Sequence, residues 1–436
     1  MKINKHCFPN GLRLVHYEDT STQMVALNIV YDVGARDEHP EHTGFAHLFE
    51  HLMFGGSAHI PDYDTPLQLA GGENNAWTNN DITNYYLTVP KPNVETAFWL
   101  ESDRMLELAF SEQSLEVQRG VVMEEFKQRC LNQPYGDVGH LFRPLAFRVH
   151  PYRWPTIGKE LSHIEQATLD EVKSFFYRFY APNNAVLAVT GNISWDETVK
   201  LTEKWFAPIP RRNVPVRQLP QEPEQTQERR LTVERNVPLD ALFMGYHMCS
   251  REGADYYAFD ILSDILSNGR SSRLNRRLVQ EQNIFSGIDA YISGTRDAGL
   301  LQISGKPAAG VSLEQAEAAV RKELEELQRS PVDGQELEKV KNKFESTQIF
   351  GNINYLNVAT NLAWFELTGK AEDIDLEVER YRSVTTEQLH TVAQRTFCES
   401  NAVVLYYKSE SPTAFTGSWN SAPAVCGVSS AQAPTG

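Results

Sequence analysis

The chain has 436 residues, of which 41% are hydrophobic and 22% are charged. This is a globular composition, and the length fits two domains of roughly 200 residues each. The formal net charge of -16 argues against a nucleic-acid-binding protein, which normally carries a basic stripe. No apolar run approaches the ~18 residues that a membrane-spanning helix needs.

The five cysteines are widely scattered and include no C-x-x-C pair. This pattern fits a reducing compartment and excludes a cysteine-rich zinc module. The first residues, MKINKHCFPNGLRL, contain lysines but lack the apolar core of a signal peptide. The sequence therefore predicts a cytoplasmic protein, or a periplasmic one if a leader peptide has been removed.

Short strands and longer helices alternate along the first half. Apolar runs with β-branched residues predict strands at 13–17 and 24–32. A dense apolar pattern between Gly44 and Gly55 predicts a helix, with Thr43 available as its cap. The pattern then predicts a strand at 82–90, helices at 94–109 and 111–131, a strand at 184–193 and a helix at 195–206.

Residues 211–231 are rich in proline and charge, which predicts a semi-extended linker between two domains. The order of elements then restarts with strands at 229–235 and 241–247, a helix at 255–267, strands at 285–293 and 297–306, helices at 312–329 and 334–349, and a strand at 401–407. The repeated order suggests a duplicated domain, at 1–210 and 232–410. Segment 411–436 is rich in Ser, Ala, Pro and Gly and is predicted to be a disordered tail.

The first predicted helix contains the motif H-x-x-E-H, formed by His47, Glu50 and His51. At about 100° per residue, the two histidines lie about 40° apart, and Glu50 shares their face. Histidines at i and i+4 can bind one metal ion, and the glutamate beside them is placed to act as a general base on water. The motif therefore predicts a zinc site, although other divalent ions are an alternative.

A catalytic zinc site normally has three protein ligands, so a third ligand is needed. The helix 111–131 contains two adjacent candidates, Glu124 and Glu125. Glu125 shares a face with Gln118 and Val121, at i, i+3 and i+7, and Glu124 points about 100° away. Spacing alone leaves both glutamates open.

The sequence resembles the pitrilysin family of inverted zinc peptidases, which includes insulinase-like and mitochondrial-processing-peptidase-like proteins. The resemblance covers about residues 8–410 and rests on GFAHLFEHLMFG at 44–55, GGENNAWT at 71–78 and VVMEE at 121–125. The family pattern around the valine pair selects Glu125 as the third ligand. One zinc ion per chain is the cofactor that the resemblance implies.

The resemblance also implies an α+β fold. It consists of two homologous domains, each an antiparallel sheet with helices on one face, which form a clamshell. A further implication is that Asn75, Ala76 and Thr78 lie near an edge strand that binds an extended peptide by strand addition.

Three positions depart from the family pattern. Gln118 stands where many members have a glutamate, so an amide would replace a charge beside the metal ligand. The family's Arg and Tyr, which contact the substrate carbonyl, correspond to Val279 and Ser286. A shifted alignment could use Arg273 and Tyr291 instead. We therefore expect a heterodimer in which a homologous subunit supplies the Arg/Tyr pair, with a homodimer as the alternative.

These features together predict a zinc-dependent endopeptidase that hydrolyses peptides or unfolded polypeptides. Glu50 would be the catalytic base, His47, His51 and Glu125 the metal ligands, and Gln118 a neighbour of the ligands. Two alternatives remain: a non-catalytic structural subunit of the same fold, and a zinc hydrolase with non-peptide substrates. Neither nucleic acid nor a membrane is expected as a partner.

Overall fold

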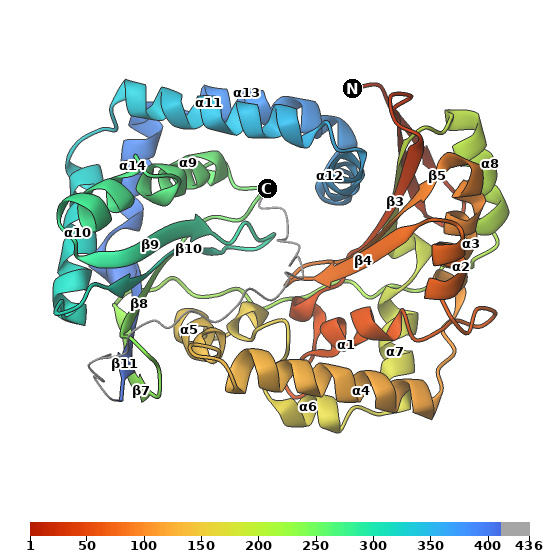
Figure 1. Cartoon of the computed structure of the whole chain (residues 1–436), viewed down its shortest axis with the longest axis horizontal. Coiled ribbons are helices and arrows are strands. Elements are labelled where there is room, and N and C mark those ends of the chain that lie inside the picture. Colours follow the sequence, from red (N-terminus) through yellow and green to blue (C-terminus); the bar gives the residue numbers. More distant parts are fainter. Residues whose placement is uncertain (411–436) are drawn as a thin grey trace, which may run out of the picture.

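The structure, a computed structural model, describes residues 1–410, so the predicted tail at 411–436 lies outside the described residues. The chain forms two β-sheets with helices packed on both (Figure 1). The first sheet has six strands in the order β1-β2-β6-β3-β5-β4, and the second has five in the order β7-β11-β8-β10-β9. The predicted α+β class with two related halves is confirmed.

The first sheet is built from residues before the proline-rich segment. Its strands are β1 (Ile3–Cys7), β2 (Arg13–Glu18), β3 (Met24–Tyr31), β4 (Glu73–Thr78), β5 (Thr83–Pro90) and β6 (Ala185–Gly191). The helices of this half are α1 (Phe45–Leu52), α2 (Asp64–Leu69), α3 (Val94–Leu106), α4 (Glu112–Phe126), α5 (Val138–Ala146), α6 (Leu161–Glu165), α7 (Leu169–Phe179) and α8 (Trp195–Trp205).

The second sheet follows the same plan. Its strands are β7 (Arg229–Arg235), β8 (Ala241–His247), β9 (Phe285–Ile292), β10 (Leu300–Pro307) and β11 (Ala402–Ser409). The helices are α9 (Tyr256–Ser267), α10 (Leu313–Arg329), α11 (Gly334–Gly351), α12 (Tyr355–Thr368), α13 (Glu377–Ser383) and α14 (Thr386–Thr396). Short π-helical segments follow α4, at Lys127–Leu131, and precede β9, at Asn275–Glu281.

The sheets are not purely antiparallel, which corrects the expectation from the family resemblance. β2 pairs with β6 in parallel, and β7 pairs with β11 in parallel. In the first half the last strand, β6, lies between β2 and β3, and in the second half the last strand, β11, lies between β7 and β8. The helices that lie between these strands in the chain provide the long crossover that a parallel pair requires.

Each sheet is also covered on its second face by a helix from the other half, so helices do not lie on one face alone. Helix α12 packs on the first sheet, and its buried face contacts Val15, Ala26, Val30, Val186 and Ala188 (Figure 1). Helix α5 packs on the second sheet, where Phe142 and Ala146 contact Val403, Leu405 and Tyr407. The sequence pattern predicts neither α5 nor α12.

The turn between β9 and β10 binds the two halves together through charged groups. The backbone N–H of Arg296 donates to Asp81 Oδ2 at 3.0 Å, and its guanidinium donates to Asp32 Oδ1 at 3.0 Å. Arg36, which is 4% exposed, lies 3.1 Å from Asp81 Oδ1 and 3.2 Å from Asp297 Oδ2. The two arginines and three aspartates therefore compensate one another's charge at the junction between the two halves.

The proline-rich segment is anchored although residues 210–228 contain no helix or strand. Arg217 binds Asp37 and Asp32, and the Glu222 carboxylate accepts hydrogen bonds from three successive backbone N–H groups, at residues 148–150. Gln225 donates to the Ala402 carbonyl. In the described part of the chain, no helix has both the length and the apolar character needed to cross a bilayer.

We expect the replacement Glu317→Gln to destabilise the second half. Glu317 on α10 accepts hydrogen bonds from both terminal nitrogens of Arg230, from Arg321 and from the Tyr406 hydroxyl. Burial disfavours its charge, but these donors outweigh burial and lower its pKa to about 2. The carboxylate therefore stabilises the fold above pH ~4.5, and this contribution is lost as the pH falls toward ~2.

Unfolding of the full chain in urea at pH 7 and at pH 3 measures this effect. Glu317→Gln should lower the free energy of unfolding by roughly 2–3 kcal/mol at pH 7, and by less at pH 3. The exposed Glu314 on the same helix provides the control Glu314→Gln. Equal losses at both pH values would contradict the assigned role of the Glu317 charge.

Candidate metal centre

Helix α1 is held at its N-terminus by a carboxylate rather than by the predicted cap. Its N-cap is Gly44, at φ 87°, and Thr43 makes no capping bond because its hydroxyl accepts from the Lys159 N–H instead. The Glu38 carboxylate accepts from the N–H groups of Gly44 and Ala46, both at 2.9 Å. The prediction for Thr43 was wrong because the cap comes from outside the local sequence.

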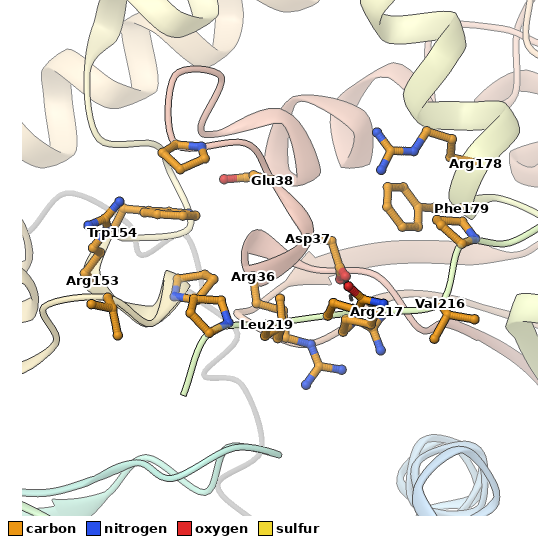
Figure 2. Close-up of a pocket in the computed structure, with 16 residues that line it drawn as sticks. Arg36, Asp37, Glu38, Arg153, Trp154, Arg178, Phe179, Val216, Arg217 and Leu219 are labelled. Carbon is orange, nitrogen blue, oxygen red and sulfur yellow. Dashed lines mark hydrogen bonds and ion pairs between the residues drawn. The ribbon is translucent and has the colours of Figure 1, made fainter. Parts of the chain in front are cut away.

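Glu38 is 7% exposed. Burial raises its pKa to about 8, although the two N–H donors act in the opposite direction. Glu38 lines a cavity of about 280 Å³, together with Trp154 and residues 215–220. Figure 2 shows how these side chains surround it. The candidate metal ligands do not line this cavity, which adjoins the segment before α1 and is separate from the candidate site.

The structure brings the three predicted ligands together. Helices α1 and α4 lie side by side (Figure 1), with His47 and His51 on α1 and Glu125 on α4. Glu125 Oε2 lies 3.4 Å from Nε2 of each histidine, and the three ligand atoms lie within 4.8 Å of one another. Glu124 points outward, with its side chain 57% exposed. Of the two glutamates left open by spacing, only Glu125 joins the group.

The protonation states suit metal binding. Burial lowers the pKa of His47, which favours the neutral imidazole that a metal requires. Burial opposes the charge of Glu125, but a hydrogen bond with His51 and the charges of His47 and Arg129 outweigh it and lower its pKa. Arg129 forms an ion pair with the other carboxylate oxygen, Oε1, at 2.9 Å. The donor set of two imidazoles and one carboxylate is typical of catalytic zinc.

Glu50 lies beside this group without joining it. Its Oε2 accepts a hydrogen bond of 2.6 Å from the Thr78 hydroxyl at the end of β4. Burial raises the pKa of Glu50, and the Thr78 hydroxyl partly offsets this shift. A carboxyl group with a raised pKa is a better match to proton transfer near neutral pH.

The predicted peptide-binding residues lie on a sheet edge. β4 is the last strand of its sheet, and among the described residues it pairs only with β5. Asn75 is exposed, and its side chain accepts from the Ala76 N–H. Gln118 lies on α4, but no described hydrogen bond joins its side chain to Glu125.

The second half does not offer the Arg/Tyr pair. Val279 packs against the core of its own half, and the Ser286 hydroxyl donates to the Lys306 carbonyl at 3.1 Å. Arg273, the alternative from a shifted alignment, forms a 2.8 Å ion pair with Glu336. Tyr291 remains half exposed on β9.

Sequence reasoning missed three contacts of the site. Arg129 stands four residues after Glu125, a spacing that could have predicted their ion pair on one helix face. The bond between Thr78 and Glu50 joins residues 28 apart, and that between Glu38 and α1 depends on the loop path. Neither of these two contacts has a sequence signal.

A two-sheet α+β chain with an H-x-x-E-H helix defines the class of inverted zinc peptidases. The family model for insulinase (peptidase family M16) matches residues 13–137, and the model for the peptidase M16 inactive domain matches residues 166–344. The chain belongs to this insulinase, or M16, family.

Similar proteins are named as zinc proteases. The zinc protease PqqE of Helicobacter pylori is 26% identical over 407 residues, covering 92% of this chain and 91% of that protein. The uncharacterized zinc protease YmxG of Bacillus subtilis is 25% identical, covering 92% of this chain and 98% of that protein.

Solved structures agree with the fold. The crystal structure of a protease from Helicobacter pylori matches with a TM-score of 0.87 at 26% identity, over 93% of this chain and 99% of that one. A putative M16-like peptidase from Alicyclobacillus acidocaldarius matches with a TM-score of 0.82 at 18% identity, over 94% and 98%. The second likeness supports the fold alone.

We expect Glu38→Ala to destabilise the metal helix. The substitution leaves two buried N–H groups at the start of α1 without an acceptor, which costs about 1–3 kcal/mol. Thermal unfolding of the full chain measures the loss. Glu41→Ala, an exposed carboxylate in the same loop, is the matched control. An unchanged melting temperature for Glu38→Ala would show that the cap does not hold the helix.

Proposed function

We propose that this chain is a zinc-dependent endopeptidase subunit. The observation that carries the proposal is the convergence of His47, His51 and Glu125, with Glu50 adjacent and hydrogen-bonded to Thr78. Burying these ionisable groups costs free energy, and a bound cation would compensate it. The convergence therefore favours a peptidase over the alternative of a purely structural subunit.

His47, His51 and Glu125 would hold the zinc ion. When bound, zinc supplies Lewis acidity, which acidifies water and polarises a carbonyl group. Glu50 takes a proton from the attacking water and passes it to the leaving amide nitrogen. Thr78 holds the Glu50 carboxylate through Oε2, so that Oε1 is available for the proton.

The edge strand β4 supports an extended peptide as the substrate. Among the described residues, its outer edge has no strand partner. A peptide could therefore add as a further strand, with main-chain hydrogen bonds providing affinity and little demand on sequence. Because Thr78 at the end of β4 contacts Glu50, a peptide on this edge would run past the catalytic base.

We expect Glu50→Gln to abolish cleavage and to leave zinc binding intact. The amide cannot accept the proton, so hydrolysis of a quenched fluorescent peptide should fall by roughly 10²–10⁴-fold. Bound zinc, measured by elemental analysis, should stay at one ion per chain because Glu50 is not a ligand. Cleavage at the wild-type rate would refute the assignment of Glu50.

The missing Arg/Tyr pair leads to a second expectation, that a homologous subunit completes the site. Val279 and Ser286 cannot donate to a developing oxyanion as Arg and Tyr do, and losing one such donor costs about 10²–10³-fold in rate. The purified chain alone should therefore cleave slowly. Adding a homologous chain that has Arg and Tyr at these positions should raise the rate in step with heterodimer formation, measured by light scattering.

The control for this experiment is the same partner with its Arg replaced by Met. This variant should still form the dimer but raise the rate much less. Full turnover by the zinc-loaded chain alone would contradict the heterodimer, as would equal stimulation by the partner and its Met variant.

A further inference from the structure

Arg143 on α5 is a half-buried cation without a matching anion. Its Nη1 donates to Asn80 Oδ1 at 3.2 Å and to the Tyr152 carbonyl at 3.3 Å. Among the described residues, no carboxylate lies within ion-pairing distance of it. Within residues 1–410, its Nε and Nη2 have no hydrogen-bond acceptor, and both atoms are accessible to solvent. Part of the guanidinium fork is therefore free to bind a ligand.

Three other arginines that lie between the two halves, at positions 36, 217 and 296, are paired with carboxylates. Arg36 contacts three aspartates, Arg217 binds Asp32 and Asp37, and Arg296 binds Asp32. The chain as a whole has an excess of negative charge. A half-buried guanidinium left without compensation carries a desolvation cost, and an anionic ligand would offset it.

The Tyr291 phenol lies on the same face of the second sheet as α5. In the strand register, Gly245 on β8 is opposite Gln302 on β10, and Gln302 is opposite Tyr291 on β9. Directly paired residues point to the same face. A Cβ at Gly245 would lie 2.8 Å from the ring of Phe142, so α5 rests on that face. Tyr291 is two strands away, roughly 10 Å.

The electrostatics agree with this placement. Burial lowers the pKa of the Arg143 guanidinium, and among neighbouring groups Tyr291 opposes this shift most. Burial raises the pKa of Tyr291, and Arg143 acts against that shift. Because its pKa is raised, Tyr291 keeps its phenolic proton, and because the residue is 46% exposed, the hydroxyl can donate a hydrogen bond to a ligand.

Arg143 also lies close to the path expected for the peptide. Thr78 at the end of β4 contacts Glu50, and Asn80, two residues further, contacts Arg143. Two residues span at most about 7 Å of chain. A peptide that is paired with β4 and reaches Glu50 would therefore bring a group only a few residues from the scissile bond to Arg143.

We propose that Arg143 and Tyr291 bind a carboxylate of the peptide substrate. This site rests on the proposed peptidase function and adds a preference for an anionic group near the scissile bond. A guanidinium fork and a phenolic hydroxyl are suited to a carboxylate, since charge-assisted hydrogen bonds are the strong ones. The carboxylate has two sources: the C-terminus of the peptide, or an acidic side chain.

Binding to the zinc-loaded Glu50→Gln chain tests the proposal without turnover. The first probe is a fluorescent peptide without acidic side chains, with either a free or an amidated C-terminus. The second probe is an amidated peptide with one Glu, placed at a different position in each of several peptides. Each is compared with the same peptide carrying Gln at that position. For at least one pair, the dissociation constant measured by fluorescence anisotropy should be about 10-fold or more lower for the peptide that has the carboxylate than for its neutral counterpart. The pair that discriminates identifies the source.

In Arg143→Gln the discrimination should disappear, and in Tyr291→Phe it should decrease. Arg143→Lys, which keeps the charge but loses the fork, should retain part of it. The control is Arg178→Gln, another arginine that makes no described ion pair and lines the cavity beside Glu38. Thermal unfolding of each variant verifies its fold.

Equal binding of charged and neutral peptides by the parent chain would overturn the proposal, and so would absence of binding or unchanged discrimination in Arg143→Gln. Cleavage assays of the wild-type chain with a partner separate this result from the proposed function. Hydrolysis without charge discrimination would refute only the carboxylate site. Charge discrimination without hydrolysis would refute only the peptidase.

Discussion

The exchange of one helix between the two halves is the constraint on which the rest of the structure depends. Helix α12 belongs to the second half in sequence but buries the second face of the first sheet, and α5 does the reverse. Burial of apolar side chains is the main stabilising term in folding, so neither sheet is complete without the other half. The halves are therefore held in one arrangement by packing, and the charged β9–β10 turn adds directional bonds to it.

This arrangement places the chemical groups. Because α5 is held on the second sheet, Arg143 contacts Asn80 in the turn that follows β4. The last residue of β4, Thr78, is hydrogen-bonded to Glu50. Helix α1 is fixed independently, by the Glu38 carboxylate at its N-terminus and by the apolar side chains it buries. The metal ligands and the edge strand are thus held by the packing of one half, as a preorganised site requires.

The site contains more ionisable groups than a buried region normally tolerates. His47, Glu50 and Glu125 all have shifted pKa values, and burial is the largest single influence on each. Perturbed groups that cluster in this way are characteristic of functional sites. In the second half, Val279 and Ser286 stand where the family pattern has an Arg and a Tyr that contact the substrate carbonyl. The absence of an Arg and a Tyr at these two positions, and not the metal site itself, is the reason for proposing that another chain completes the chemistry.

The sequence by itself determined the local features. The periodicity of apolar residues predicted strands such as β3 and helices such as α9. The i, i+4 histidines of α1 predicted the metal site, since the relative position of neighbours along one helix can be inferred without tertiary structure. Glu125 needed the family resemblance, because spacing could not separate it from Glu124. Only the tertiary structure decided the contacts between distant segments. These are the Glu38 cap, the bond from Thr78 to Glu50, the parallel strand pairs, the exchanged helices and the approach of Arg143 to Asn80. Each depends on the path of the chain through space, which no local pattern records.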